Sequence, residues 1–176
     1  MLPELKAAIA DYFKKYDIKC GTNNVVVRSG IFELLQDIYK FTNLKDDEKI
    51  LFNLPVSSYF IQECHDNGIA VEFLNTDAKN NWKINLVDLE NILAKQKIRI
   101  LFLNYPNIVS GAFLDRDEAL KLSDIIIKYP DLLVVVDESL RGSFGDLNID
   151  SKQFSLGAVA NIADQIITIR TYALYT

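Results

Sequence analysis

Residues 101–111 read LFLNYPNIVSG, and further along the chain residues 134–138 read VVVDE. Each segment begins as an apolar run of strand length and ends in a polar or turn-forming cluster. Strands that are apolar at nearly every position are typical of parallel sheets, because helices cover both faces. Ligands of open α/β sheets bind at the carboxyl ends of such strands. The two segments therefore predict a parallel sheet with a candidate site where the apolar runs end.

Helical and strand patterns alternate along the rest of the chain. Short apolar or β-branched runs predict six strands, at residues 25–27, 49–54, 69–73, 98–103, 132–136 and 165–169. Helical spacing predicts helices at residues 2–16, 31–42 and 57–66, after Asn85 as a cap, and after Asp115 and Glu118 as a capping pair. Strands that alternate with helices in this way form parallel sheets through right-handed crossovers. We expect an α/β three-layer sandwich, with a largely parallel sheet of about six strands and helices on both faces.

The composition excludes several classes of protein. At 176 residues and 49% hydrophobic, the chain can bury one sizeable core. A net charge of −5 and the absence of a Lys/Arg block argue against a nucleic-acid partner. Apolar stretches fall far short of the roughly 20 residues that a membrane span needs. Two cysteines are too few for a disulfide framework, and the N-terminus does not resemble a secretion signal, so we expect a cytoplasmic protein without a membrane partner.

Two isolated polar residues invite a functional interpretation. His65 follows Glu63 and Cys64, but adjacent side chains do not converge on one ion, so we expect a surface histidine and no metal site. Arg141, beside Gly142, is either an anion contact or a solvated charge at the end of a strand, and we expect the latter.

Five segments stand in a fixed order along the chain: LPELKAAIA at 2–10, VRSG at 27–30, PNIVSG at 106–111, VDE at 136–138 and ITIR at 167–170. Together they resemble the class I/II aminotransferases, fold type I pyridoxal-phosphate enzymes that include the histidinol-phosphate aminotransferase type. In that family the first segment leads into the large domain and the second holds the cofactor phosphate. The third and fourth correspond to the Pro-Asn-Asn-Pro-Thr-Gly and Asp-Glu motifs, and the fifth precedes the catalytic lysine. The resemblance implies that residues 1–176 form a partial large domain, without the N-terminal arm and the C-terminal small domain.

The resemblance also implies pyridoxal phosphate as the cofactor. Asp137 would pair with the ring nitrogen and keep it protonated, and Gly30, Ile31 and Asn107 would be the other cofactor-binding positions. Main-chain N–H groups after Gly30, at the start of a helix, would hold the phosphate. Two simpler interpretations stay open. Asp137 could satisfy turn amides only, and the Gly30 turn could serve packing.

Several positions depart from the family pattern. The second Asn of Pro-Asn-Asn-Pro-Thr-Gly falls on Ile108 and the Tyr of Asp-Glu-x-Tyr falls on Leu140, so both usual partners of the phenolic oxygen of the cofactor are missing. The aromatic residue that stacks on the cofactor ring falls on Ser57, with Tyr59 or Phe60 as substitutes if the loop shifts.

The Schiff-base lysine is also missing. Without a gap, Leu174 takes its position; with a gap, residues 171–174 match the Thr-Tyr-Ala-Leu that follows the lysine, and the Ser-x-x-Lys motif is deleted. Covalent and general-base catalysis both need this amine. We therefore expect a domain that has lost transaminase activity and has no catalytic residues. It would bind the cofactor weakly if at all, and it would be a remnant or a protein-binding scaffold. The alternative is an active aminotransferase on amino acids, completed by another chain. Self-association or another protein subunit is expected in either case.

Overall fold

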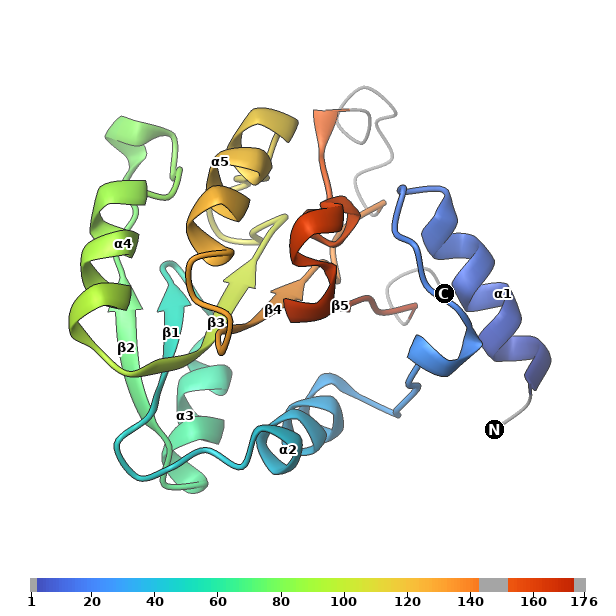
Figure 1. Ribbon diagram of the computed structural model, residues 1–176, viewed down its shortest axis with the longest axis horizontal. Coiled ribbons are helices and arrows are strands. Elements are labelled where there is room, and N and C mark those ends of the chain that lie inside the picture. Colours follow the sequence, from blue (N-terminus) through green and yellow to red (C-terminus); the bar gives the residue numbers. More distant parts are fainter. Residues whose placement is uncertain (1–2, 143–151, 173–176) are drawn as a thin grey trace.

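The computed structural model describes residues 3–142 and 152–172. Its centre is one sheet of five parallel strands in the order β2-β1-β3-β4-β5 (Figure 1). The strands are β1 (Lys49–Asn53), β2 (Ala70–Leu74), β3 (Ile98–Asn104), β4 (Leu133–Asp137) and β5 (Ile166–Ile169). The α-helices are α1 (Pro3–Lys14), α2 (Ile31–Thr42), α3 (Ser58–Asp66), α4 (Leu86–Lys95) and α5 (Arg116–Ile126). Short 3₁₀ turns are η1 (Thr22–Asn24), η2 (Ala78–Asn80), η3 (Leu156–Ala158) and η4 (Ala160–Gln165). The predicted α/β fold is confirmed.

Helices cover both faces of the sheet (Figure 1). Successive residues of a strand point to opposite faces, so each strand contributes to two cores. Leu101 and Leu103 of β3 belong to the core under α4 and α5, whereas Ile100 and Phe102 belong to the core above α2 and α3. All four side chains are at most 2% exposed. This double burial explains why the segment is apolar at every position, and it confirms the three-layer arrangement.

The expected strand at residues 25–27 is wrong, and the sheet has five strands within the described residues. Val25 has extended backbone angles (φ −98°, ψ 121°), so the β-branched run does favour the local conformation. No ladder joins it to a neighbour, and Val26 is 57% exposed. A strand needs a partner along its length, and the conformational preference of a short run does not supply one.

The predicted helix caps are confirmed. Asn85 accepts hydrogen bonds from the main-chain N–H groups of Val87 at 3.0 Å and Asp88 at 3.3 Å at the start of α4. Asp115 and Glu118 form a reciprocal capping box at the start of α5, with distances of 2.8 and 3.1 Å. These bonds satisfy N–H groups that have no partner within the helix. Local polar residues therefore determine where both helices begin.

Helix α1 lies outside the layered part of the structure, beyond the β5 edge of the sheet (Figure 1). Ala10 is its one buried residue. Nowhere in residues 3–142 and 152–172 does a helix combine the length and the apolar character needed to cross a membrane.

Candidate functional site

Asp137 is a buried carboxylate at the carboxyl end of β4, with 5% of its surface exposed. Asn104, at the end of β3, donates from Nδ2 to Asp137 Oδ2 at 2.9 Å. Ser139 donates twice to Oδ1, from its main-chain N–H at 3.0 Å and from its hydroxyl. Burial raises the pKa of the Asp137 carboxyl, although the bonds from Ser139 and Asn104 oppose the shift. The side chain is thus held rigidly at the edge where ligands of parallel sheets bind.

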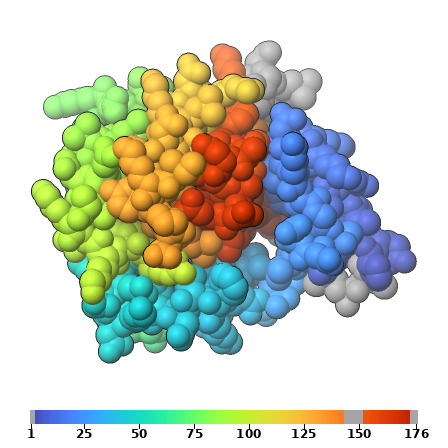
Figure 2. Space-filling view, in the orientation of Figure 1, coloured from blue at the N-terminus to red at the C-terminus, as the bar shows by residue number. Residues whose placement is uncertain are grey.

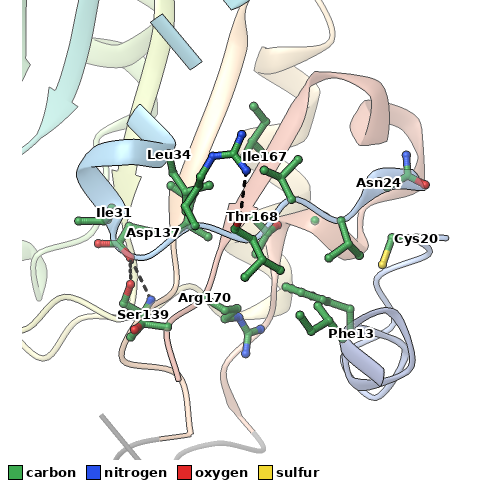
Figure 3. A pocket seen from close by; sticks show the side chains of 18 of the residues that line it. Phe13, Cys20, Asn24, Ile31, Leu34, Asp137, Ser139, Ile167, Thr168 and Arg170 are labelled. Atoms are coloured by element: carbon green, nitrogen blue, oxygen red, sulfur yellow. Dashed lines mark hydrogen bonds between the residues drawn. The ribbon is translucent and has the colours of Figure 1, made fainter. Parts of the chain in front are cut away.

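Asp137 lines a cavity of about 1120 Å³ between β5 and the segment that leads into α2. Figure 2 shows the hollow between the blue N-terminal residues and the red residues around β5. Figure 3 shows Asp137 and Ser139 on one side of this cavity and Phe13 and Cys20 on the other. The walls are largely apolar. Gly30 and Ile31, two of the predicted cofactor-binding residues, also line it.

The first turn of α2 carries a carboxylate of the chain itself, Glu33. Glu33 accepts a hydrogen bond from the Ser29 main-chain N–H at 3.2 Å, and its bonds to Ser29 lower the pKa of Glu33. Gly30 has an extended φ of −166°, and a Cβ at this position would meet nothing within 4 Å. Neither sterics nor backbone conformation therefore requires glycine here. An anionic ligand at this helix terminus would meet the negative charge of Glu33.

Asn107 lies outside this cavity and ties two loops together. Its Nδ2 donates to the Pro55 carbonyl at 2.7 Å, and its Oδ1 accepts from the main-chain N–H groups of Val109 and Ser110, each at 3.0 Å. Nearby, the Asn104 N–H donates to Asn53 Oδ1 at 3.0 Å. Both polar atoms of the Asn107 side chain are therefore used in bonds that stabilise these loops.

The departures from the family pattern occupy different environments. Ile108 is 72% exposed, and Ser57 caps α3 by accepting from the Tyr59 N–H at 3.4 Å. Tyr59 is 72% exposed and does not line the cavity, whereas Phe60 does. Phe60 also packs on Phe102, with ring centroids 4.8 Å apart. Of the two possible aromatic substitutes, the structure brings only Phe60 to the cavity.

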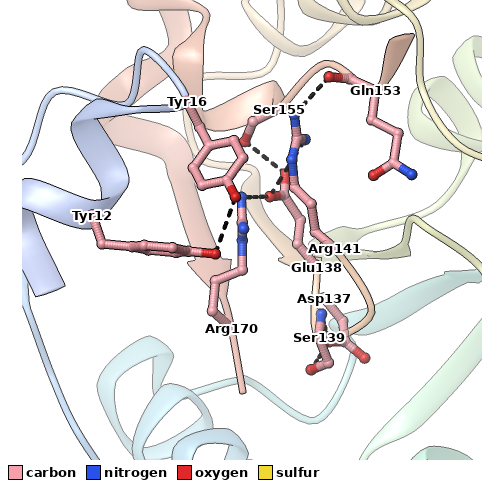
Figure 4. A network of polar contacts seen from close by, with 9 residues as sticks. All are labelled: Tyr12, Tyr16, Asp137, Glu138, Ser139, Arg141, Gln153, Ser155 and Arg170. Atoms are coloured by element: carbon pink, nitrogen blue, oxygen red, sulfur yellow. Dashed lines mark hydrogen bonds and ion pairs between the residues drawn. The ribbon is translucent and has the colours of Figure 1, made fainter. Parts of the chain in front are cut away.

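Sequence reasoning missed a buried ionic cluster beside the cavity (Figure 4). Glu138 accepts from Arg170 Nη2 at 2.5 Å and from the Ser155 hydroxyl at 2.6 Å. Arg141, expected to be solvated, is 5% exposed; it lies 3.7 Å from Glu138 and donates to the Gln153 carbonyl at 2.6 Å. The expectation was wrong because a charge three residues after Glu138 can pair with it across a turn. The three-residue spacing between Glu138 and Arg141 was the feature of the sequence that could have predicted this ion pair.

The cluster also anchors α1. The Arg170 guanidinium lies 4.5 Å from the ring centroid of Tyr16, and the Arg141 guanidinium lies 4.8 Å from the same ring. Such cation–π contacts are strongest where water is excluded. Tyr12 extends the group, with its hydroxyl 3.1 Å from that of Tyr16. Tyr12 of α1 and Tyr16, two residues beyond its end, thereby hold the helix against the end of β5.

No lysine in the described residues is positioned at Asp137. Lys83 pairs with Glu118 at 2.8 Å and with Asp115 at 3.7 Å, and Lys152 is exposed. Lys19 lines the cavity, but it precedes Cys20, which Figure 3 shows far across from Asp137.

The donor set therefore does not fit a pyridoxal cofactor as the family holds it. The described residues offer Asp137 as a ring-nitrogen partner, but Lys19 is the one lysine among them that lines the same cavity, and a carboxylate, Glu33, lies in the first turn of the helix that would bind the phosphate. His65 is a surface residue as expected, its side chain 82% exposed. Within the described ranges no group of three or more His, Cys, Asp or Glu side chains is arranged to hold a metal ion.

Known proteins resemble this chain over most of its length. An aspartate aminotransferase of Pyrococcus horikoshii is 28% identical over 143 residues, covering 78% of this chain and 34% of that protein. A probable aspartate/prephenate aminotransferase of Rickettsia felis is 26% identical over 171 residues, covering 96% of this chain and 40% of the relative. The chain thus spans between a third and two fifths of the length of these relatives.

Solved structures show the same fold. An aromatic aminotransferase from Pyrococcus horikoshii superposes with a TM-score of 0.85 at 23% identity, over 97% of this chain and 45% of that protein. The PLP-bound C-S lyase from Staphylococcus hominis gives a TM-score of 0.84 at 18% identity, over 99% of this chain and 45% of the lyase. The family model described as aminotransferase class I and II matches residues 1–173. This chain belongs to the class I and II aminotransferase family.

Proposed function

We propose that these 176 residues form an aminotransferase-like domain that has lost transaminase activity and serves as a protein-binding scaffold. The observation that carries the proposal is the position of the lysines. Within the described residues, Lys83 is paired elsewhere, Lys152 is exposed, and Lys19 is next in sequence to Cys20, which Figure 3 shows across the cavity from Asp137. Without an amine within reach of the aldehyde of a cofactor whose ring nitrogen pairs with Asp137, neither Schiff-base formation nor proton transfer by that amine can occur.

A spectroscopic titration tests this proposal directly. The protein is mixed with pyridoxal phosphate, its visible spectrum is recorded, and borohydride is added before peptide mapping. We expect no saturable band and no transamination between an amino acid and a 2-oxo acid. A modification confined to Lys19 would be an adventitious adduct, which Lys19→Arg should remove. Stoichiometric fixation on another lysine, together with measurable transamination, would overturn the proposal.

A second candidate function is favoured by the environment of Asp137. Its carboxylate keeps a buried position at the end of β4 and accepts three hydrogen bonds, one from Asn104 and two from Ser139. The domain could then contribute this group to a pyridoxal-phosphate-dependent aminotransferase acting on amino acids, with the missing lysine on another chain. Saturable, noncovalent binding of pyridoxal phosphate that Asp137→Ala weakens at least tenfold would favour this second function. Equal affinities would exclude it.

We also propose that the domain associates with itself or with another protein subunit, in a cytoplasmic setting. Exposed apolar side chains support association, since Phe41 is 79% exposed and Leu5 is 45% exposed. Cys20 and Cys64 are both free thiols, which suits a reducing compartment. Light scattering over a range of concentrations tests self-association, and a constant monomer mass would count against it.

A further inference from the structure

We draw no further inference here: the strongest candidate, the small cavity between residues 81–83 and the first turn of α5, has two carboxylates, Asp115 and Glu118, that already pair with Lys83, and nothing among the described residues shows what would bind there.

Discussion

The side chains of Asn104 and Asp137 meet at 2.9 Å across the carboxyl ends of two neighbouring strands. They are partners in the register of β3 and β4, so the pairing of apolar residues along these strands brings the two polar groups together. The hydrogen bond therefore links the central part of the sheet to the candidate site, and a change at either residue should affect both.

Removing the amide should destabilise the protein. Asn104→Ala leaves one oxygen of a buried carboxylate without its donor, and we expect the free energy of unfolding to fall by about 1–3 kcal/mol. Urea denaturation measures the change. Asn91→Ala, at an exposed position of α4, is the control and should stay within about 0.5 kcal/mol of the parent. A matching loss in both variants would contradict the assigned hydrogen bond.

Asp137 should make stability depend on pH. Because burial raises the pKa of this carboxyl in the folded state, the folded protein holds the proton more tightly than the unfolded chain does. The resulting stabilisation is complete below the ordinary pKa of aspartate and is lost as the pH rises through the raised value. Asp137→Asn has no such proton, and the Asn104 amide can rotate to pair with it. In urea denaturation from about pH 3.5 to 7, the variant should gain stability relative to the parent as the pH rises. A pH-independent difference would show that this carboxyl is not responsible.

Glu138 should be among the most sensitive polar positions. Glu138→Gln leaves the guanidinium groups of Arg170 and Arg141 buried without their counter-charge, and we expect a loss of about 3–5 kcal/mol. The control is Glu90→Gln, which breaks an exposed pair with Lys128 and should cost less than about 1 kcal/mol. Chemical denaturation of both variants, with near-ultraviolet circular dichroism to follow Tyr12 and Tyr16, distinguishes the two cases. Comparable losses would mean that the cluster is solvated.

A side chain at position 157 should destabilise the protein unless the side chain of Thr168 moves. A Cβ at Gly157 would lie 2.6 Å from Thr168 Oγ1 and 3.4 Å from Ile18 Cδ1. Gly157→Ala should therefore destabilise the protein by about 1–3 kcal/mol through overpacking. Adding Thr168→Ala removes the nearer atom and should restore part of the loss. A double-mutant cycle with zero coupling would show that the contact is not the cause.

Much of the fold could be predicted because its determinants are local. The buried strands are apolar at successive positions, and Asn85 and Asp115 mark helix starts with their own side chains. The strand expected at residues 25–27 failed because pairing depends on a partner that is distant in sequence. A short β-branched run carries no information about whether that partner is adjacent.

The candidate site was only partly predictable for a similar reason. Asp137 could be placed because it ends a buried strand. The pairing of Glu138 with Arg170 could not, because the register of β4 and β5 brings together residues that are 32 positions apart. The role of Asn107 also depends on a distant loop, the one that contains Pro55.

The strand order has a consequence for access to the molecule. Winding reverses between β1 and β3, and in open α/β sheets such a reversal leaves a crevice that commonly admits ligands. Here side-chain amides form hydrogen bonds across this crevice. Asn53 Oδ1 accepts from the Asn104 N–H, and Asn107 Nδ2 donates to the Pro55 carbonyl. Among the described residues, the cavity that Asp137 lines lies instead beside β5, at the other end of the carboxyl edge from this crevice.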